Sequence, residues 1–148
     1  MSELRDLYQE VILEHGKKPR NFRTMEEGSL HVEGYNPLCG DKFTIFLKME
    51  GDKICDVCFH GHGCAISTAS ASLMTESLKG KTKAEVDLLF RGFQHLVTDG
   101  IVPPDFQLGK LAVFAGVREF PVRVKCATLP WHTLNAALRG QDQPVSTE

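Results

Sequence analysis

The residues of this chain best suited to chemistry are its five cysteines, Cys39, Cys55, Cys58, Cys64 and Cys126. A cysteine thiolate attacks sulfur and binds soft metal ions, so each of them is a candidate nucleophile or ligand. Their odd number argues weakly against a framework of paired disulfides and for metal binding or thiol chemistry. The alternative for any one of them is a small buried hydrophobe.

The densest cluster is the stretch CFHGHGCAIS at residues 58–67, with Cys55 just upstream. Cys55 and Cys58 have the C-x-x-C spacing of a zinc knuckle, which needs a turn between its cysteines. The run ICDVCF instead has strand character, and residues three apart on a strand point to opposite faces. We therefore expect one cysteine inward beside Val57 and Phe59 and the other outward, with His60 and His62 as neighbours rather than ligands.

Two glycines in that stretch are more informative than the histidines. Gly61 and Gly63 let the chain leave the strand, turn sharply and bring Cys64 to the start of the next helix. The positive end of the helix dipole favours a thiolate there, which is the form that binds metals and attacks sulfur.

Three cysteines share this kind of position. Cys39 lies in the turn-rich loop NPLCGD close to Asp41, Cys64 lies at the strand-to-helix turn, and Cys126 lies near an irregular helix start. Three thiolates and one carboxylate make a credible tetrahedral zinc set, and they also suit iron–sulfur chemistry. Spacing alone does not prove that these segments converge.

Hydrophobic periodicity predicts the elements that must position them. Residues 2–15 read as an amphipathic helix with the apolar stripe Leu4, Leu7, Tyr8, Val11 and Ile12. Residues 30–35, 43–49 and 54–60 read as strands, and the simplest arrangement is a three-stranded antiparallel sheet. Helices are expected at 66–78, after the capping box of Thr82 and Glu85, and at 110–117. The predicted fold is α+β, with a three-stranded antiparallel sheet packed against helices.

The last element allows two interpretations because it contains Pro130. A helix through Pro130 loses one backbone hydrogen bond, whereas a fresh helix near Thr128 would place the proline in its first turn. In both cases Cys126 is expected near a helix N-terminus, with a lowered pKa and an exposed sulfur. We expect one domain over residues 1–140 and a flexible tail over 141–148.

Bulk properties exclude some classes of function. The net charge of −2 argues against a nucleic-acid partner. No apolar run approaches the ~18 residues needed to cross a membrane, and the first ten residues lack the apolar core of a signal peptide. We therefore expect a cytoplasmic protein without a membrane or nucleic-acid partner.

The cysteine motifs resemble those of a known family. NPLCGD (36–41), GHGCAIS (61–67) and RVKCATL (123–129) look like the three cysteine motifs of the iron–sulfur assembly proteins of the IscU/NifU N-terminal type. YQEVILEHGKKPRN (8–21) resembles the N-terminal helix and connector of that family. Lys125 stands where the IscU branch has a histidine, and the region 81–106 looks longer than in IscU. In both respects the sequence resembles the SufU branch of the family.

The resemblance implies an IscU-like fold and a Zn2+ ion held by Cys39, Asp41, Cys64 and Cys126. It also implies a PLP-dependent cysteine desulfurase of the SufS type as partner, with downstream iron–sulfur assembly machinery beyond it. In the family, Cys39 would leave zinc when a partner histidine replaces it, and would then accept sulfur as the reactive thiolate. No family role transfers to Cys55 or Cys58.

Two basic residues flank the third motif. Arg123 could bind an acidic partner surface, and the alternative is a solvated or locally paired side chain. Lys125 could tune the thiolates through its charge, but a protonated lysine cannot replace a histidine ligand.

Three functions follow as hypotheses. The first is a zinc-dependent sulfurtransferase that relays persulfide sulfur, rather than a stand-alone enzyme. The second is a scaffold that builds a [2Fe–2S] cluster on the same ligands. The third is a module whose zinc is purely structural. Lys125 in place of histidine favours the first over the second, and Asp41 as a ligand argues against the third, because structural zinc sites are usually closed by Cys and His.

Overall fold

The alternating strand pattern folds into a mixed four-stranded sheet in the computed structural model of the chain. The structure describes residues 2–25, 30–103, 108–141 and 143–147, and only the backbone of residues 2–9. Strands β1 (Leu30–Asn36), β2 (Asp41–Glu50) and β3 (Lys53–His62) form the predicted antiparallel meander. The short strand β4 (Val145–Ser146) pairs with β1 in parallel, which gives the order β3-β2-β1-β4.

The fourth strand corrects the expectation of a three-stranded sheet. It lies in the polar C-terminal segment, where two residues are too few to show the alternation that marks a strand. The open edge of β1 recruits it, since Gly34 pairs with Val145 and the Thr147 N–H donates to the Tyr35 carbonyl at 3.0 Å. Such a contact depends on tertiary proximity rather than on local pattern.

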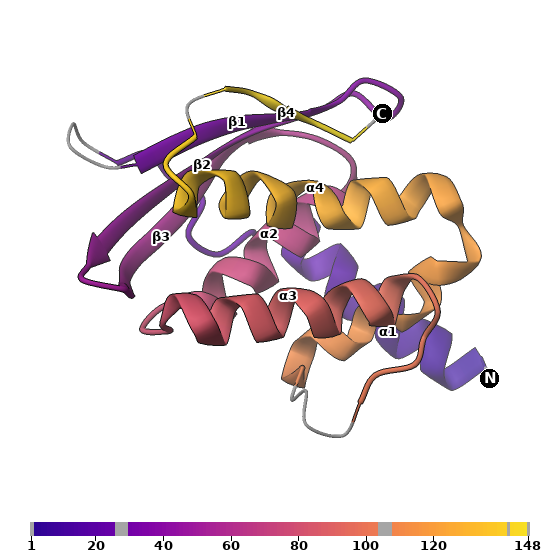
Figure 1. Ribbon diagram of the computed structural model, residues 1–148. Coiled ribbons are helices and arrows are strands. Elements are labelled where there is room, and N and C mark those ends of the chain that lie inside the picture. The colour runs from indigo at the N-terminus through magenta and orange to yellow at the C-terminus, as the bar shows by residue number, and fades with distance from the viewer. Residues whose placement is uncertain (1, 26–29, 104–107, 142, 148) are drawn as a thin grey trace.

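The helices cover one face of this sheet in two tiers (Figure 1). α2 (Ala65–Leu78) and α4 (Pro121–Leu138) pack directly on the strands. α1 (Ser2–Lys17), α3 (Lys83–Val97) and the 3-10 helix η1 (Gly109–Glu119) pack against those two helices. No helix among the described residues has the length and apolar character needed to cross a membrane.

The inward faces of the strands and the first tier of helices form the core. Ile45, Leu47, Val57 and Phe59 are fully buried on the sheet, as their alternating spacing predicts. Burial of each such side chain contributes about 1.5–3 kcal/mol to the free energy of unfolding. Of the apolar stripe expected on the first helix, Ile12 is buried and Val11 half-buried, while the side chains of Leu4, Leu7 and Tyr8 lie outside the described residues. This core holds rigid the strand ends and helix starts that carry the cysteines.

α4 decides between the two interpretations of Pro130. It begins at Pro121 and runs through Pro130 to Leu138, so the alternative of a fresh helix near Thr128 is wrong. The proline removes one backbone hydrogen bond, but the helix buries Leu129, Trp131 and Leu134, which offsets that loss. Cys126 therefore lies in the second helical turn.

Candidate metal and thiol site

Strand register assembles the first part of the site. Asn36, the last residue of β1, pairs with Asp41, the first residue of β2, so the NPLCGD loop closes a hairpin. Within this loop the Cys39 N–H donates to the Asn36 carbonyl at 3.2 Å. The hairpin therefore presents the Cys39 thiol and the Asp41 carboxylate at the same end of the sheet.

The strand-to-helix turn supplies Cys64, as the two glycines predict. Gly61 has a φ of 137°, a conformation that L side chains rarely adopt, and a Cβ there would lie 2.1 Å from the Lys42 carbonyl oxygen. At Gly63 a Cβ would lie 2.6 Å from Ser67 Oγ and 2.7 Å from Asp41 Oδ1. Both positions therefore require glycine for the turn to close against β2.

Three of the predicted site residues converge. The ligand atoms of Cys39, Asp41 and Cys126 all lie within 4.8 Å of one another. The Cys126 thiol donates a hydrogen bond to Cys39 Sγ, with the two sulfurs 2.9 Å apart. α4 thus carries Cys126 from far along the chain to the end of the β1–β2 hairpin.

Cys64 joins this cluster at its margin. It is the N-cap residue of α2, and its sulfur accepts from the Ser67 N–H at 3.5 Å. The Cys64 N–H donates to Asp41 Oδ1 at 2.8 Å, and the Ser67 hydroxyl donates to the same oxygen at 2.9 Å. Asp41 is therefore oriented by the start of α2, next to the Cys64 sulfur.

The thiols perturb each other's protonation. A hydrogen bond from Cys126 lowers the pKa of Cys64 to about 6, assisted by the hydrogen bonds from Ser67 and against the effect of burial. The pKa of Cys126 is raised, first by its hydrogen bond to Cys64 and then by burial. The expectation of an exposed Cys126 with a lowered pKa is therefore wrong, because the side chain is 0% exposed under the hairpin loop.

Asn36 is a site residue that the sequence analysis missed. Its fully buried side chain donates from Nδ2 to Cys126 Sγ at 3.5 Å and to Asp41 Oδ2 at 3.4 Å. Its Oδ1 has no hydrogen-bond partner among the described residues. The available signal in the sequence was the position of Asn36 as the first residue of the NPLCGD motif. Ser67 was missed too, although it stands at the N3 position where an N-cap partner is expected.

The cluster fits a tetrahedral zinc ion. With Zn–S bonds of about 2.3 Å, the sulfur ligands of such a site lie roughly 3.8 Å apart, comparable to the spread of the three converged atoms. Zinc would replace the proton that Cys39 and Cys126 share, and the two thiolates of this close pair would then move apart. A set of thiolates with one carboxylate is also chemically suited to zinc.

The two basic residues of the third motif point to different places. Arg123 lies beside the thiols. The pKa of its guanidinium is raised mainly by the charge of the Cys64 thiolate, and also by a hydrogen bond to Cys126. It is exposed, so it can meet a partner as well as the sulfurs. Lys125 lines a separate groove between α4 and β4 rather than the cavity over the thiols.

The remaining ligand candidates stay outside the cluster. Cys55 and Cys58 both lie on β3, Cys55 exposed at an irregularity of register and Cys58 buried. Cys58 pairs with Phe46, on the face opposite to Val57 and Phe59. His60 and His62 are exposed on the same strand, and among the described residues only Cys39, Asp41 and Cys126 form a group with metal-ligand geometry.

A cavity of about 660 Å3 opens over the thiols, with Cys39, Cys64 and Arg123 in its lining. Its rim includes three exposed apolar side chains, Leu38 (66% exposed), Phe120 (58%) and Val122 (52%). Apolar side chains gathered on a rim mark a surface that binds another molecule. The sequence analysis missed this rim because exposure of an apolar residue is decided only by the fold.

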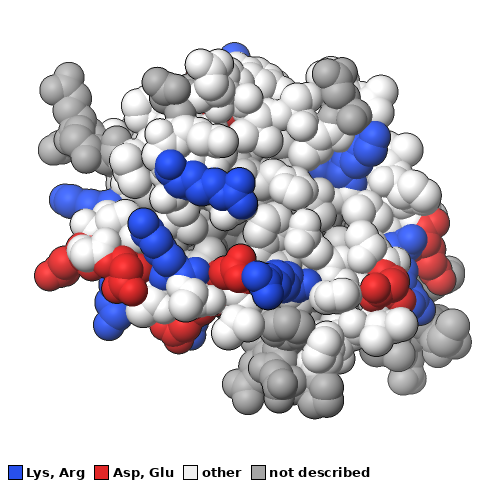
Figure 2. All heavy atoms as spheres, in the orientation of Figure 1, with Lys and Arg blue, Asp and Glu red and all other residues white. Residues whose placement is uncertain are grey.

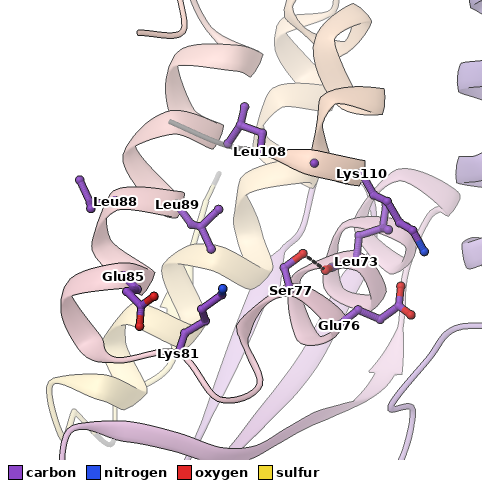
Figure 3. A pocket seen from close by; sticks show the side chains of 10 residues that line it. Leu73, Glu76, Ser77, Lys81, Glu85, Leu88, Leu89, Leu108 and Lys110 are labelled. Atoms are coloured by element: carbon purple, nitrogen blue, oxygen red, sulfur yellow. Dashed lines mark hydrogen bonds between the residues drawn. The ribbon is translucent and has the colours of Figure 1, made fainter. Parts of the chain in front are cut away.

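A second cavity of about 500 Å3 lies away from the cysteines, between α2, α3 and η1 (Figure 3). Two lysines and two glutamates line it, Lys81, Lys110, Glu76 and Glu85, above a floor of leucines. The Ser77 hydroxyl at its edge donates to the Leu73 carbonyl at 2.8 Å. Because the described residues that line it include no thiol and their charges balance, they offer none of the chemistry of the site.

Gly63→Ala is expected to break the cluster while leaving the fold intact. The new methyl group would overlap Ser67 Oγ and Asp41 Oδ1 and so displace the carboxylate from the thiols. We expect the zinc bound per chain to fall to less than about half of the wild-type value, as when a contact that orients a metal ligand is lost. Elemental analysis measures it, with Gly80→Ala as control, since Gly80 has a φ of 81° but no atom within 4 Å of a new Cβ. Full zinc content in Gly63→Ala would contradict the assigned geometry.

Comparison with known proteins places this geometry in a family. The family described as NifU-like N terminal domain matches residues 7–127, a span that contains Cys39, Asp41, Cys64 and Cys126. The chain is 36% identical over 141 residues to the zinc-dependent sulfurtransferase SufU of Bacillus subtilis, covering 95% of each. It is 40% identical over 139 residues to the iron-sulfur cluster assembly scaffold protein IscU of Streptococcus pyogenes, covering 94% of this chain and 87% of that one.

A solved structure agrees with the fold. The putative iron-sulfur cluster assembly scaffold protein for the SUF system of Fervidobacterium islandicum superposes with a TM-score of 0.82 at 39% identity, covering 87% of this chain and 94% of that one. The family match spans most of the chain, and both relatives are matched over nearly their whole length. The chain therefore belongs to the NifU-like N-terminal domain family of iron–sulfur cluster assembly proteins, on its IscU/SufU side.

Proposed function

We propose that this protein is a zinc-dependent sulfur-transfer protein, which accepts persulfide sulfur on Cys39 from a SufS-type cysteine desulfurase for iron–sulfur cluster assembly. The observation that carries the proposal is the difference in access within the cluster. Cys39 and Cys64 are half-buried in the cavity, Cys39 on the hairpin loop and Cys64 fixed as the N-cap of α2, whereas Asp41 and Cys126 are buried beneath it. An accessible thiolate can attack a sulfur on another protein, and buried ligands can hold the metal.

We assign zinc to Cys39, Asp41, Cys64 and Cys126. The ligand atoms of Cys39, Asp41 and Cys126 lie within 4.8 Å of one another, and the hydrogen bonds of Cys64 to Asp41 and Cys126 support its inclusion. When bound, the ion keeps thiolates deprotonated at neutral pH. Asn36 and Ser67 orient the ligands, Asn36 by donating to Cys126 Sγ and Ser67 by donating to Asp41.

The transfer step is a thiol exchange. The Cys39 thiolate attacks the terminal sulfur of the desulfurase persulfide, and the S–S bond of that persulfide breaks. The new S–S bond leaves Cys39 as the persulfide, and the desulfurase cysteine departs as a thiolate. No net oxidation occurs. Gly40, with a φ of 71° and no atom near a would-be Cβ, leaves the backbone beside Cys39 free to move toward a partner.

The surface around Cys39 suits a protein partner. Leu38, Phe120 and Val122 surround the thiol with exposed apolar area, and Arg123 adds a positive charge. Interfaces favour such a centre, where aromatic and Arg anchors exclude water. We place this encounter in the cytoplasm, with downstream iron–sulfur assembly machinery as the recipient of the sulfur.

Metal content is expected to be about one zinc per chain, and to survive loss of the other two cysteines. Cys55→Ser/Cys58→Ser changes thiols that lie on β3 outside the ligand cluster, so zinc should remain within error of wild type. Elemental analysis of the purified proteins measures this. A double variant without zinc would mean that the C-x-x-C pair binds the metal instead.

A [2Fe–2S] scaffold is the second candidate function. It is favoured by the similarity to a protein named as an IscU scaffold, at 40% identity. The same thiolates and carboxylate suit iron. Anaerobic incubation with ferric iron and sulfide separates the two. A visible cluster spectrum together with loss of zinc would support the scaffold. Retained zinc without such a spectrum would support sulfur transfer.

A further inference from the structure

The groove between α4 and β4 lies on the other side of α4 from the thiols and has a volume of about 430 Å3. Five of its lining residues come from one stripe of α4, spaced by three or four positions: Lys125, Thr128, His132, Asn135 and Arg139. Residues at this spacing lie on one face of a helix, so all five side chains point to the same side. The volume is in the range of small-molecule sites.

The opposite wall is the C-terminal segment that the sequence did not predict to be ordered. Val145, Ser146 and Thr147 line the groove from that side. Thr147 is held in place by its N–H, which donates to the Tyr35 carbonyl at 3.0 Å, and by its hydroxyl, which donates to the Lys125 carbonyl at 3.3 Å. The groove is therefore a concave site with two walls.

The charged side chains among the described residues that line the groove all have one sign. Lys125 and Arg139 stand toward its two ends, and neither forms an ion pair with a described residue. No carboxylate occurs among the described residues that line it, although the chain carries 19 acidic residues against 17 basic ones. On the face shown in Figure 2, blue and white side chains lie over α4, whereas red and blue ones are interspersed lower on this face. Two unpaired cations in an acidic protein point to an anionic ligand.

Hydroxyl, amide and imidazole groups fill the space between the two cations. Asn135 and Ser146 each offer a neutral hydrogen-bond donor, whereas the Thr128 hydroxyl already donates to the Val124 carbonyl at 2.9 Å. The His132 ring packs edge-on against Phe90, with centroids 5.2 Å apart. Burial lowers the pKa of His132, so the ring is neutral at pH 7 and adds one N–H donor.

We propose that this groove binds an elongated small polyanion of the di- or triphosphate class. The Cα atoms of Lys125 and Arg139 are separated by about 21 Å along the helix, so a single orthophosphate cannot reach both side chains. A chain of phosphoryl groups can contact the two cations at its ends and the neutral donors along its length. The site is independent of the thiol chemistry proposed above.

The test uses the full-length, zinc-loaded protein and inorganic triphosphate as probe, followed by amide NMR shifts and calorimetric titration. We expect saturable shifts along α4 and β4, and binding weakened by roughly five- to tenfold in each of Lys125→Gln and Arg139→Gln. Lys83→Gln, which removes an exposed lysine at the start of α3, is the matched control and should bind as wild type. ATP and orthophosphate are run beside it: ATP tests whether a nucleoside is tolerated, and orthophosphate should bind far more weakly.

Several results would overturn the proposal. One is the absence of binding, and another is an equal loss in Lys83→Gln, which would indicate a diffuse charge effect. Shifts centred on Cys39 and Cys64 together with a fall in zinc content would indicate chelation of the metal rather than binding in the groove. Thermal unfolding of both groove variants checks that they remain folded, and Arg139→Gln alone suffices if Lys125→Gln disturbs the neighbouring Cys126.

Discussion

Cys39→Ala is expected to abolish persulfide acceptance. Of the thiols that remain, Cys126 is fully buried, and Cys64, which is half-buried in the same cavity, is fixed as the N-cap of α2 and is a proposed zinc ligand. Stimulation of a SufS-type desulfurase by the zinc-loaded protein should fall by about tenfold or more, because the covalent path is lost. Desulfurase turnover and mass spectrometry of the alkylated protein measure it, and a persulfide should be trapped on the wild type only.

Two controls keep this result specific. Cys55→Ala removes an exposed thiol outside the cluster and should stimulate as the wild type does. Zinc content is measured on Cys39→Ala itself, because the substitution also removes a proposed ligand. If Cys39→Ala stimulates the desulfurase as strongly as the wild type does, the transfer role is contradicted and a purely structural zinc is favoured.

Removal of zinc is expected to lower the thermal midpoint substantially. The proposed ligands come from the β1–β2 hairpin, the start of α2 and the second turn of α4, so the ion would link three parts of the fold. A ligand present at a thousandfold excess over its dissociation constant stabilises the folded state by about 4.1 kcal/mol. At roughly 2–4 °C per kcal/mol for a domain of this size, chelation should lower the midpoint by about 8–16 °C.

Calorimetry before and after chelation, with zinc restored as the reversibility check, measures this shift. The Cys55→Ser/Cys58→Ser variant should show the same drop, because its metal site is intact. An unchanged midpoint in the wild type after verified removal of zinc would show that the site does not bridge these elements.

Local sequence pattern was sufficient to predict most of the helices and strands, and the turn that presents Cys64 to the site. The alternation in β2 and β3, the capping box at Thr82 and Glu85, and the glycine turn before Cys64 are all local signals, and the structure confirms them. Strand geometry also predicted that one of Cys55 and Cys58 would be buried and the other exposed, as the structure shows. The buried one, however, is Cys58, on the face opposite to Val57 and Phe59, because the register of β3 shifts at Cys55.

Local pattern failed where distant parts of the chain meet. The two-residue β4 exists only because β1 offers an open edge, and the burial of Cys126 exists only because α4 passes under the hairpin loop. Helix position predicted a low pKa for Cys126, but the nearby Cys64 and Cys39 sulfurs and burial reverse its direction. Contacts from other elements outweighed the local effect.

By itself, the sequence determined which residues of this protein could do chemistry, namely thiols and a carboxylate on loops and helix starts, and the strands and helices that carry them. The tertiary structure alone decided that Cys39, Asp41 and Cys126 meet within 4.8 Å, that Cys39 is the accessible one of these three, and that a two-walled basic groove forms behind α4. The physical reason is that backbone propensity and periodicity act over a few residues. Convergence, burial and proton sharing depend instead on how separate elements pack.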